Sequence, residues 1–408
     1  MPALEVDVVV AGGGAAGLFA AATAARRGRT VALLEKNDRP GLKILISGGG
    51  RCNVTTTRSG KDLERQYGER RGRFLRHSLH GLPPTAVVEH FERLGVPLRE
   101  EDLEKLFPVS QKARDVLDAL LRDCRDSGAK LCTRTPLLGL RHDGAKFVAT
   151  TPAGDIVSPS FVLATGGLSY PKTGATGDGY PIAAAFGHTI TSTFPALAPL
   201  QVDEAWVRSL QGIVLHGVEM ASLDADGKVV TRRTRPILFT HKGLSGPAPM
   251  DLAGDIEERG GGLVRFDFAP EVPADRLEAH WLEEVKSHGK RGVASLLPPT
   301  LPDRAREAIV GIAQCDGLTL ANLDRAARQR LLRATKDLRV PVRRSLGFDH
   351  AEVTRGGVAL DEVDPKTMQS RLRPGLWFCG EVLDVDGPIG GFNFQAAFAT
   401  GRVAGLHA

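Results

Sequence analysis

Short apolar runs alternate with glycine-rich turns at the start of the chain. Residues 6–11 form a β-branched apolar run, which is typical of a buried parallel strand. The glycine-rich residues 12–17 follow at once, and the alanine-rich residues 18–27 favour a helix. Residues 30–34 are a second apolar run. This pattern predicts one βαβ unit.

The same periodicities predict further helices and strands up to about residue 190. Amphipathic helices are expected over residues 84–94 and 113–126. Strands are expected over residues 130–141, 146–151 and 161–164. This mixture of helices and short buried strands indicates an α/β domain.

The pattern of apolar and polar residues changes after about residue 190. Residues 191–270 contain alternating apolar and polar segments, such as 212–221 and 228–238, and predict a mainly β region. Residues 274–340 have a mostly helical pattern with a proline-rich break. The chain then returns to short strands, such as 376–379, and ends in a helix rich in alanine and glycine.

The composition is that of an ordinary globular protein, with 408 residues of which 42% are hydrophobic and 25% charged. At roughly 150 residues per domain, this length suggests two or three domains. No run approaches the roughly 18 uninterrupted apolar residues of a membrane span, so no membrane partner is expected. Five cysteines without a CxxC pair argue against a disulfide framework and a zinc site. We therefore expect a cytoplasmic protein without a metal.

The net charge of +5 is modest, and most of the excess is local. Residues 321–344 hold eight Lys or Arg against two Asp or Glu, and a second basic cluster covers residues 65–76. A solvated helix face is the main interpretation of such charge runs. Nucleic-acid binding stays as the less favoured alternative, because no aromatic residues interleave the later cluster as a stacking platform would require.

Residues 12–17 match G-x-G-x-x-G in its required context, directly after a strand and at the start of a helix. Gly12 makes the tight turn, Gly14 lets the backbone approach a pyrophosphate, and Gly17 allows close packing of helix and strand. The helix N-terminus attracts the phosphates. Glu35, at the end of the second strand, can accept hydrogen bonds from the ribose hydroxyls of an adenosine. An acid here disfavours a 2′-phosphate, which leaves FAD or NAD.

Four further segments favour FAD over NAD. Residues 161–167 are a strand that ends in small residues, and residues 375–381 are a late strand that ends in an acid suited to a ribityl chain. Residues 390–395 precede the final helix, and residues 47–53 form a glycine-rich loop able to lie against an isoalloxazine. NAD needs only one βαβ unit and a neighbour, so this number of loops indicates the longer cofactor.

These residues resemble the YhiN/BaiN-like family of flavoproteins, within the FAD-binding branch that contains fumarate reductase flavoprotein and glutathione reductase-like enzymes. The similarity runs through residues 12–55, 106–116, 163–180, 238–248 and 351–397. The LISGGGRCN segment and the GEVLDVDG…GGFNFQ segment are highly specific to this family.

The resemblance implies an α/β fold with an FAD-binding Rossmann-like domain of the glutathione reductase/fumarate reductase flavoprotein type. This domain would be discontinuous, formed by residues 1–190 and 345–408. A β-rich module at 191–272 and a helical module at 273–344 would be inserted and would cap the flavin. The residues that the family motifs place at FAD are Gly12, Gly14, Ala15, Ala16, Gly17, Glu35, Lys36, Ser47, Gly48, Gly49, Gly50, Arg51, Cys52, Asn53, Thr165, Gly166, Gly167, Gly380, Glu381, Gly391, Phe392, Asn393 and Gln395.

The activity expected from the resemblance is that of an FAD-dependent oxidoreductase that transfers hydride through flavin N5. We favour NAD(P)H-linked reduction of an activated C=C bond in a small organic substrate. No second G-x-G-x-x-G follows a strand, so NAD(P)H would bind only transiently. The alternatives are a small-amine oxidase that uses dioxygen and a flavin-containing RNA-binding protein that uses residues 321–344.

Three residues are candidates for catalysis beside the flavin. His241, in the segment Phe239-Thr240-His241, is a candidate proton donor or substrate anchor. Tyr170 lies in the loop after a strand, and Asp386 precedes the glycines that would face the flavin. For each, the alternative is a structural hydrogen bond or a solvated position.

Arg51 could offset charge on reduced flavin or on the phosphates, and the alternative is a surface ion pair. Cys52 and Cys379 both fall in segments expected to bind flavin. A redox dithiol is conceivable, but we expect buried, inert thiols.

Overall fold

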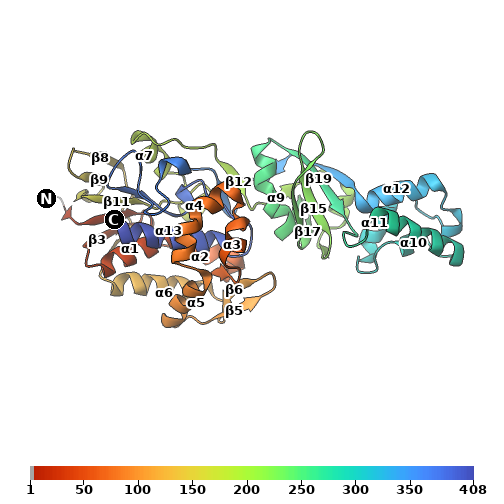
Figure 1. The fold of residues 1–408 in the computed structure, drawn as a ribbon, viewed down its shortest axis with the longest axis horizontal. Coiled ribbons are helices and arrows are strands. Elements are labelled where there is room, and N and C mark those ends of the chain that lie inside the picture. The colour runs from red at the N-terminus through yellow and green to blue at the C-terminus, as the bar shows by residue number, and fades with distance from the viewer. Residues whose placement is uncertain (1–3) are drawn as a thin grey trace. The chain divides into compact units, whose positions relative to one another are not determined.

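The computed structural model describes residues 4–408, which divide into two compact units (Figure 1). The two ends of the chain, up to Phe194 and from Glu352 onward, form the first unit. Pro195–Ala351 form the second. None of the helices within residues 4–408 has the length and apolar character needed to span a membrane.

A five-stranded parallel sheet is the centre of the first unit. Its order is β23-β11-β2-β3-β7, so a strand from the end of the chain pairs with one from its middle. Every residue of β2 and β3 is buried, as expected for a parallel sheet covered on both faces. The five strands are β2 (Val8–Ala11), β3 (Val31–Leu34), β7 (Lys130–Cys132), β11 (Ser160–Leu163) and β23 (Leu376–Phe378).

Two helices from opposite ends of the chain, α1 (Ala15–Arg26) and α13 (Phe392–His407), pack against each other (Figure 1). Glycines make this contact close. A Cβ atom on Gly401 would overlap the carbonyl oxygen of Ala16, because the two backbones approach directly. The C-terminal helix is therefore part of the same core as the N-terminal βαβ unit.

Over the described residues, the first unit also has a four-stranded sheet, a three-stranded sheet and six more α-helices. One sheet has the order β1-β10-β9-β8 and the other β4-β6-β5. The remaining elements of this unit are β1 (Leu4–Glu5), α2 (Leu42–Ile46), β4 (Thr55–Thr56), α3 (Gly60–Gln66), α4 (Gly68–Gly81), α5 (Pro84–Arg93), β5 (Leu98–Glu101), β6 (Lys105–Pro108), α6 (Ala113–Asp126), β8 (Gly139–His142), β9 (Phe147–Thr151), β10 (Gly154–Ser158), α7 (Gly179–Ala185) and β22 (Val353–Arg355), with β12 (Phe194–Ala196) at its limit.

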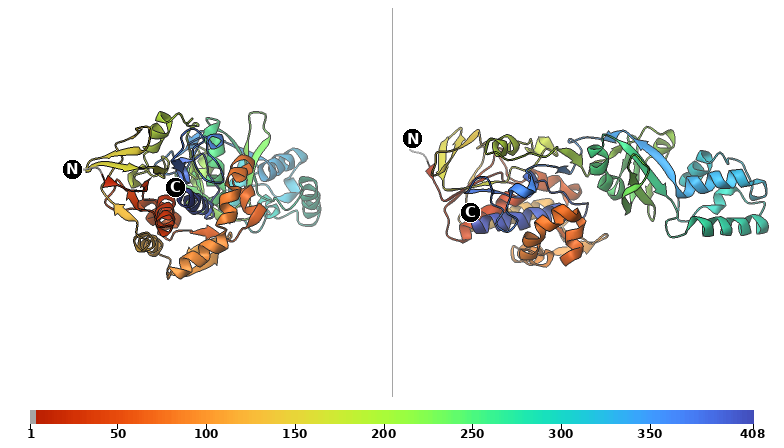
Figure 2. Two further views of the ribbon diagram at one scale, coloured as in Figure 1. Left: turned by 60° about the vertical axis from the view of Figure 1, so that its left-hand side comes forward. Right: turned by 45° about the horizontal axis from the view of Figure 1, so that its top comes forward.

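The second unit combines two antiparallel sheets with helices, and they share one hydrophobic cluster (Figure 2). The sheet orders are β14-β17-β18-β13-β21 and β16-β15-β19-β20. Trp281 of α10 is fully buried in the cluster, and its indole N–H donates to the carbonyl of Leu296 at 2.9 Å. The elements are β13 (Leu200–Gln201), α8 (Ala205–Ser209), β14 (Val214–Leu215), β15 (Glu219–Leu223), β16 (Val229–Thr234), β17 (Ile237–Thr240), β18 (Gly243–Ser245), α9 (Pro247–Glu258), β19 (Gly262–Asp267), α10 (Ala274–Ser287), α11 (Asp303–Ile312), α12 (Arg325–Lys336), β20 (Leu338–Val342) and β21 (Arg344–Ser345).

The predicted α/β class is confirmed, and the prediction of one strand over residues 130–141 is wrong. The segment 130–141 is two strands in different sheets, because Arg134 has a positive φ of 52° and Pro136 cannot donate to a ladder. The segment 228–238 likewise divides, with Pro236 between β16 and β17. The segment 212–221 divides at Gly217, whose φ is 69°.

Candidate functional site

Among the glycines of residues 12–17, the fold itself requires Gly12 and Gly17 but not Gly14. Gly12 has a φ of 108°, and a Cβ there would overlap the carbonyl oxygen of Ala164. A Cβ on Gly17 would overlap the carbonyl oxygen of Gly12. Gly14 differs, because its φ is −80° and a Cβ would meet nothing within 4 Å. The backbone at Gly14 is therefore open to a ligand.

The N-terminus of α1 offers unused hydrogen-bond donors. No side chain caps it, and its first turn contains no acidic residue. Within residues 4–408, the backbone N–H groups of Gly14, Ala15, Ala16 and Gly17 donate to no protein acceptor. Such a terminus attracts an anion through its free N–H groups and its dipole. The arrangement fits the pyrophosphate of a dinucleotide.

Glu35 lies beside the glycine turn at the end of β3 and is only 8% exposed. Its Oε2 accepts a hydrogen bond from the backbone N–H of Gly13 at 3.0 Å, and its Oε1 accepts from that of Asn37 at 2.8 Å. Burial raises the pKa of Glu35 against the lowering effect of these hydrogen bonds. The next residue, Lys36, points to a different loop, where its Nζ lies 2.5 Å from a carboxylate oxygen of Asp178.

Glu381 follows β23 and is held by residues of β22 and α2. Its Oε1 accepts from the backbone N–H of Thr354 at 2.9 Å, and its Oε2 lies 2.7 Å from Nζ of Lys43. The predicted residues Gly166 and Gly167 lie in the loop after β11, where a Cβ on Gly167 would lie 3.0 Å from Oε1 of Glu381.

The loop after β23 reaches the start of α1, and the loop after β11 contains a hydroxyl that is unpaired among the described residues. A Cβ on Gly380 would lie 2.6 Å from the Cβ of Ala16. The hydroxyl of Thr165 is buried and has no hydrogen-bond partner within residues 4–408. A buried polar atom without a partner indicates a bound group that supplies one. The structure thus gathers the predicted residues from three parts of the chain at one edge of the parallel sheet.

The loop from Ser47 to Asn53 is built on left-handed backbone. Gly48, Gly49 and Gly50 have φ values of 55°, 69° and 84°. The ends of the loop are fixed, because the N–H of Cys52 donates to the carbonyl of Ser47 at 3.0 Å and Oδ1 of Asn53 accepts from Leu106 at 3.2 Å. A Cβ on Gly49 would meet nothing within 4 Å, so the loop backbone is accessible to a ligand there.

The side chain of Arg51 is engaged within the protein. Its guanidinium lies over the ring of Phe107 at 4.1 Å, and it pairs with Glu101 at 2.9 Å and with Gln111 at 2.9 Å. These contacts match the ion-pair alternative for Arg51. The thiol of Cys52 is fully buried, which raises its pKa to about 12, and burial also raises the pKa of Cys379. Both thiols therefore stay protonated at neutral pH.

Residues 390–395 were predicted to precede the final helix, but α13 already begins at Phe392, so most of this segment is helical. The side chains here bind protein partners. The amide of Asn393 bonds to the backbone of Gly387 at 2.9 Å in both directions, and Nε2 of Gln395 donates to Leu82 at 2.6 Å. Gly391 has a φ of 86°, so it supplies the turn into the helix. These side chains shape the loop, and only backbone groups remain for a cofactor.

The three catalytic candidates lie in different surroundings. Tyr170 is half-buried in the first unit with a φ of 53°, and burial raises the pKa of its hydroxyl. Asp386, also in the first unit, is 8% exposed and pairs with Arg71 at 3.2 Å and with Arg355 at 3.2 Å. His241 is exposed and belongs to the second unit.

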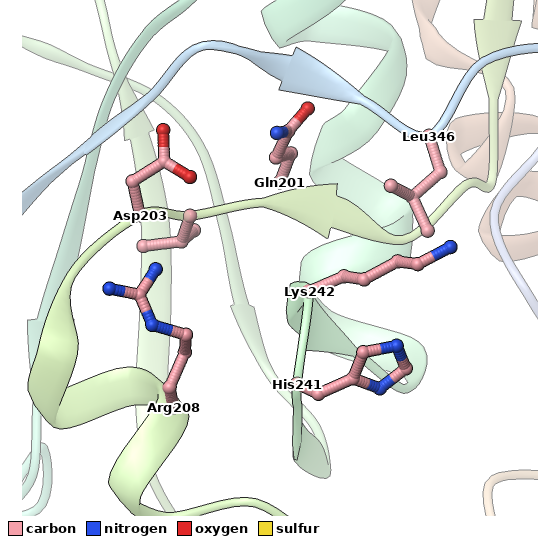
Figure 3. A pocket seen from close by; sticks show the side chains of 7 residues that line it. Gln201, Asp203, Arg208, His241, Lys242 and Leu346 are labelled. Carbon is pink, nitrogen blue, oxygen red and sulfur yellow. The ribbon is translucent and has the colours of Figure 1, made fainter.

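His241 lines a cavity of about 370 Å³ that lies wholly within the second unit (Figure 3). The cavity lies where the turn between β17 and β18 meets β13 and α8. Two cationic side chains line it together with this histidine. Its lining residues are Gln201, Val202, Asp203, Arg208, His241, Lys242 and Leu346.

The family model of the HI0933-like protein Rossmann domain matches residues 6–407. The chain belongs to the HI0933-like family. It is 33% identical over 395 residues to a ribosomal RNA dihydrouridine synthase of Escherichia coli, covering 97% of this chain and 96% of the relative. It is 30% identical over 406 residues to a 3-dehydro-bile acid delta(4,6)-reductase of Clostridium scindens, covering 97% of each. The predicted YhiN/BaiN-like membership is confirmed.

A solved structure supports the fold. The 3-ketosteroid delta1-dehydrogenase of Sterolibacterium denitrificans has a TM-score of 0.53 with this chain at 14% identity, and the match covers 99% of both chains. At that identity the likeness concerns the fold alone. The likeness confirms the predicted Rossmann-like fold. The family membership confirms the predicted class of FAD-dependent oxidoreductase.

One part of this HI0933-like site was missed from the sequence. We interpreted the basic cluster at residues 65–76 as a solvated helix face, but Arg70 and Arg71 of α4 both pair with Asp384, the latter at 2.9 Å. Arg71 also reaches Asp386. The arginines of residues 65–76 and the acid Asp386 were each noted from the sequence, but not as partners. No local pattern pairs residues that lie more than 300 positions apart.

His188, a buried histidine of the first unit, should make the stability of the protein depend on pH. His188 Nε2 lies 2.7 Å from the hydroxyl of Ser370, its Nδ1 lies 3.2 Å from Glu362, and burial lowers its pKa. As the pH falls, His188 takes up its proton at a higher pH in the unfolded chain than in the folded protein. The free energy of unfolding should therefore fall as the pH drops below about 6.5. The variant His188→Asn should show a shallower fall between neutral and mildly acidic pH in denaturant titrations. Equal slopes would contradict this assignment.

Proposed function

We propose that this protein is an FAD-dependent reductase that adds two hydrogens across a C=C bond conjugated to a carbonyl group, with NAD(P)H as the electron donor. The observation that carries the proposal is the set of unpaired N–H donors at the start of α1, with Glu35 and Glu381 beside it. The named relatives share this chemistry, since dihydrouridine is uridine with one ring double bond saturated, and a delta(4,6)-reductase is named for C=C bonds.

The residues present fit FAD. The N–H groups of residues 14–17 would hold the pyrophosphate, and the open face at Gly14 would let the backbone come close to it. Glu35 would hold the adenosine ribose, and Glu381 would hold hydroxyls of the ribityl chain. The unpartnered hydroxyl of Thr165 would gain its hydrogen bond from the same ligand.

FAD, when bound, supplies hydride transfer at flavin N5. Reduction of a C=C bond also needs a proton, and the chain must hold that proton near neutral pH. A tyrosine hydroxyl is protonated at neutral pH, so Tyr170, whose pKa burial raises further, is our candidate donor. Asp386 is held by two arginines, and we assign it to ordering the loop before the final helix. His241 is our candidate anchor for the substrate.

The substrate class has two candidates. The first is a small organic enone, the class expected from the sequence. The second is a uracil ring in RNA, which the name of the Escherichia coli relative favours. The basic segment 321–344 does not itself carry the RNA proposal, because Arg328 pairs with Glu278 at 3.0 Å and Lys336 pairs with Asp267 at 2.8 Å. We place the reaction in the cytoplasm, where the five unpaired cysteines would stay reduced.

The electron donor can be identified with the purified holoenzyme. Under anaerobic conditions, NADH, NADPH and a panel of small amines are mixed with it in turn, and flavin absorbance is followed. Rapid bleaching by a reduced nicotinamide supports the proposal. If only an amine bleaches the flavin, and peroxide forms when air is admitted, the protein is an amine oxidase and the proposed reductase activity is wrong.

Glu35→Ala should weaken FAD retention more than it changes the turnover of flavin-loaded protein. Losing a hydrogen bond to a charged group costs about 1.5–3 kcal/mol, which corresponds to about tenfold to a hundredfold in affinity. Equilibrium dialysis of the apoprotein against FAD measures the change, and Glu5→Ala, on an exposed strand, is the control. If the loaded variant lost turnover at unchanged FAD affinity, Glu35 would belong to the reaction centre instead.

A further inference from the structure

Three basic side chains without a partner among residues 4–408 line the cavity of the second unit. Arg208 comes from α8, while His241 and Lys242 come from the turn between β17 and β18 (Figure 3). Across residues 4–408, these three side chains form no hydrogen bond or ion pair. Single unpaired cations are common on surfaces. Three donors that line one hollow are the arrangement expected of a binding site.

The turn that carries two of these side chains is held in place. Gly243 has a φ of 139°, and a Cβ there would overlap the carbonyl oxygen of Leu200 on β13. The hydroxyl of Thr240 donates to the carbonyl of Gly243 at 3.1 Å, and the N–H of Val202 donates to the carbonyl of Lys242 at 3.2 Å. A fixed turn presents His241 and Lys242 without a large ordering cost on binding.

The charge around the cavity favours an anion. The acid in its lining, Asp203, lies 3.8 Å from the guanidinium of Arg343, which offsets its charge. Arg208 and Lys242 then remain as uncompensated cations. Arg344 adds to them, because it stands opposite Gln201 in the β13–β21 register and opposite residues share one face of a sheet.

We propose that this cavity binds a phosphate group carried by the substrate or by the electron donor. The guanidinium of Arg208 can take two oxygens of the group. Lys242 adds a second positive charge to the cavity lining, and an imidazole N–H of His241 adds a further donor. The cavity volume of about 370 Å³ exceeds that of a phosphate alone, so an attached sugar fits as well. The inference rests on the proposed function only in assigning the phosphate to a reactant.

Binding is measured on the oxidised holoenzyme without reductant, so that failure of C=C reduction and failure of this site are separate results. The probes are inorganic phosphate, NADPH beside NADH, and a short fluorescent oligouridylate. Wild type is compared with the double variant Arg208→Gln/Lys242→Gln. The control is Arg259→Gln/Lys290→Gln, which removes the same charge from exposed residues of the same unit outside the cavity.

The cavity variant should bind at least one phosphate-bearing probe about tenfold or more weakly, since removing a hydrogen bond to a charged group costs about 1.5–3 kcal/mol. For oligouridylate, the slope of log affinity against log salt should become shallower by about 0.7 for each phosphate that the variant no longer neutralises. The control should match wild type. The charge-keeping variant Arg208→Lys/Lys242→Arg should retain binding, which separates loss of charge from loss of fold.

The pattern of weakened binding identifies the source of the phosphate. Weakened oligouridylate binding assigns the cavity to an RNA backbone, and a loss specific to NADPH over NADH assigns it to the donor. Both outcomes support the proposal. Equal affinities of the cavity variant and the control for every probe, with FAD content and thermal stability intact, would overturn it.

Discussion

Gly17→Ala is expected to abolish FAD retention and to destabilise the first unit. The added methyl would overlap the carbonyl oxygen of Gly12, which is backbone and cannot turn aside. Overpacking of this kind costs about 1–3 kcal/mol and occasionally more, and the upper end applies because the strand, turn and helix would all have to shift. Denaturant titration of the apoprotein gives the stability, and flavin released on denaturation gives the retention.

Gly14→Ala is the matched variant, because it places the same methyl in the same turn without a protein clash. The apoprotein should keep wild-type stability, while FAD affinity should fall about tenfold to a hundredfold from a clash worth about 1–3 kcal/mol. A stable Gly14→Ala protein with unchanged FAD affinity would place the pyrophosphate elsewhere. A stable Gly17→Ala protein would contradict the packing argument for the third glycine.

Arg71→Ala should be the most destabilising surface-helix substitution in the first unit. Its guanidinium pairs with Asp384 and Asp386, whose side chains are 6% and 8% exposed. Removing one partner of a buried ion pair costs about 3–5 kcal/mol, and we expect about 3 kcal/mol because Arg70 and Arg355 still contact these aspartates. The free energy of unfolding from denaturant titration measures this loss.

Arg73→Ala provides the comparison two positions along α4. Its ion pair with Glu69 is exposed on both sides, at 69% and 88%, so the change should stay within about 0.5 kcal/mol. Arg71→Lys, which keeps the charge but not the forked geometry, should recover part of the loss. Equal effects of Arg71→Ala and Arg73→Ala would show that the buried pairing contributes nothing to stability.

Local patterns predicted the elements that depend on neighbours in the sequence. The helix over 113–126 has the predicted bounds, because its apolar positions recur at helical spacing. The βαβ unit was recognisable because the glycine turn, the strand and the helix follow one another directly. The prediction of one strand over residues 130–141 was wrong, because the alternation of apolar and polar residues alone does not reveal the break at Pro136.

The parts of the site that the sequence did not reveal depend on contacts between distant segments. The pairing of Arg71 with Asp384 joins α4 to a loop near the end of the chain. The side-chain partner of Gln395 is Leu82, which also lies on a distant segment, so family motifs alone placed Gln395 at the cofactor. The cavity around His241 needs β13, α8 and the β17–β18 turn together, and only His241 was singled out from the sequence.

The central claim is that reduced FAD on this protein passes hydrogen to a conjugated C=C bond. The most direct measurement reduces the holoenzyme anaerobically and then adds, in separate single-turnover reactions, an oligouridylate and a steroid enone. One of the two substrates should restore the flavin absorbance, and the mass of that substrate should rise by two hydrogens. If both substrates remain unchanged and dioxygen alone reoxidises the flavin, the protein is not a reductase of conjugated C=C bonds.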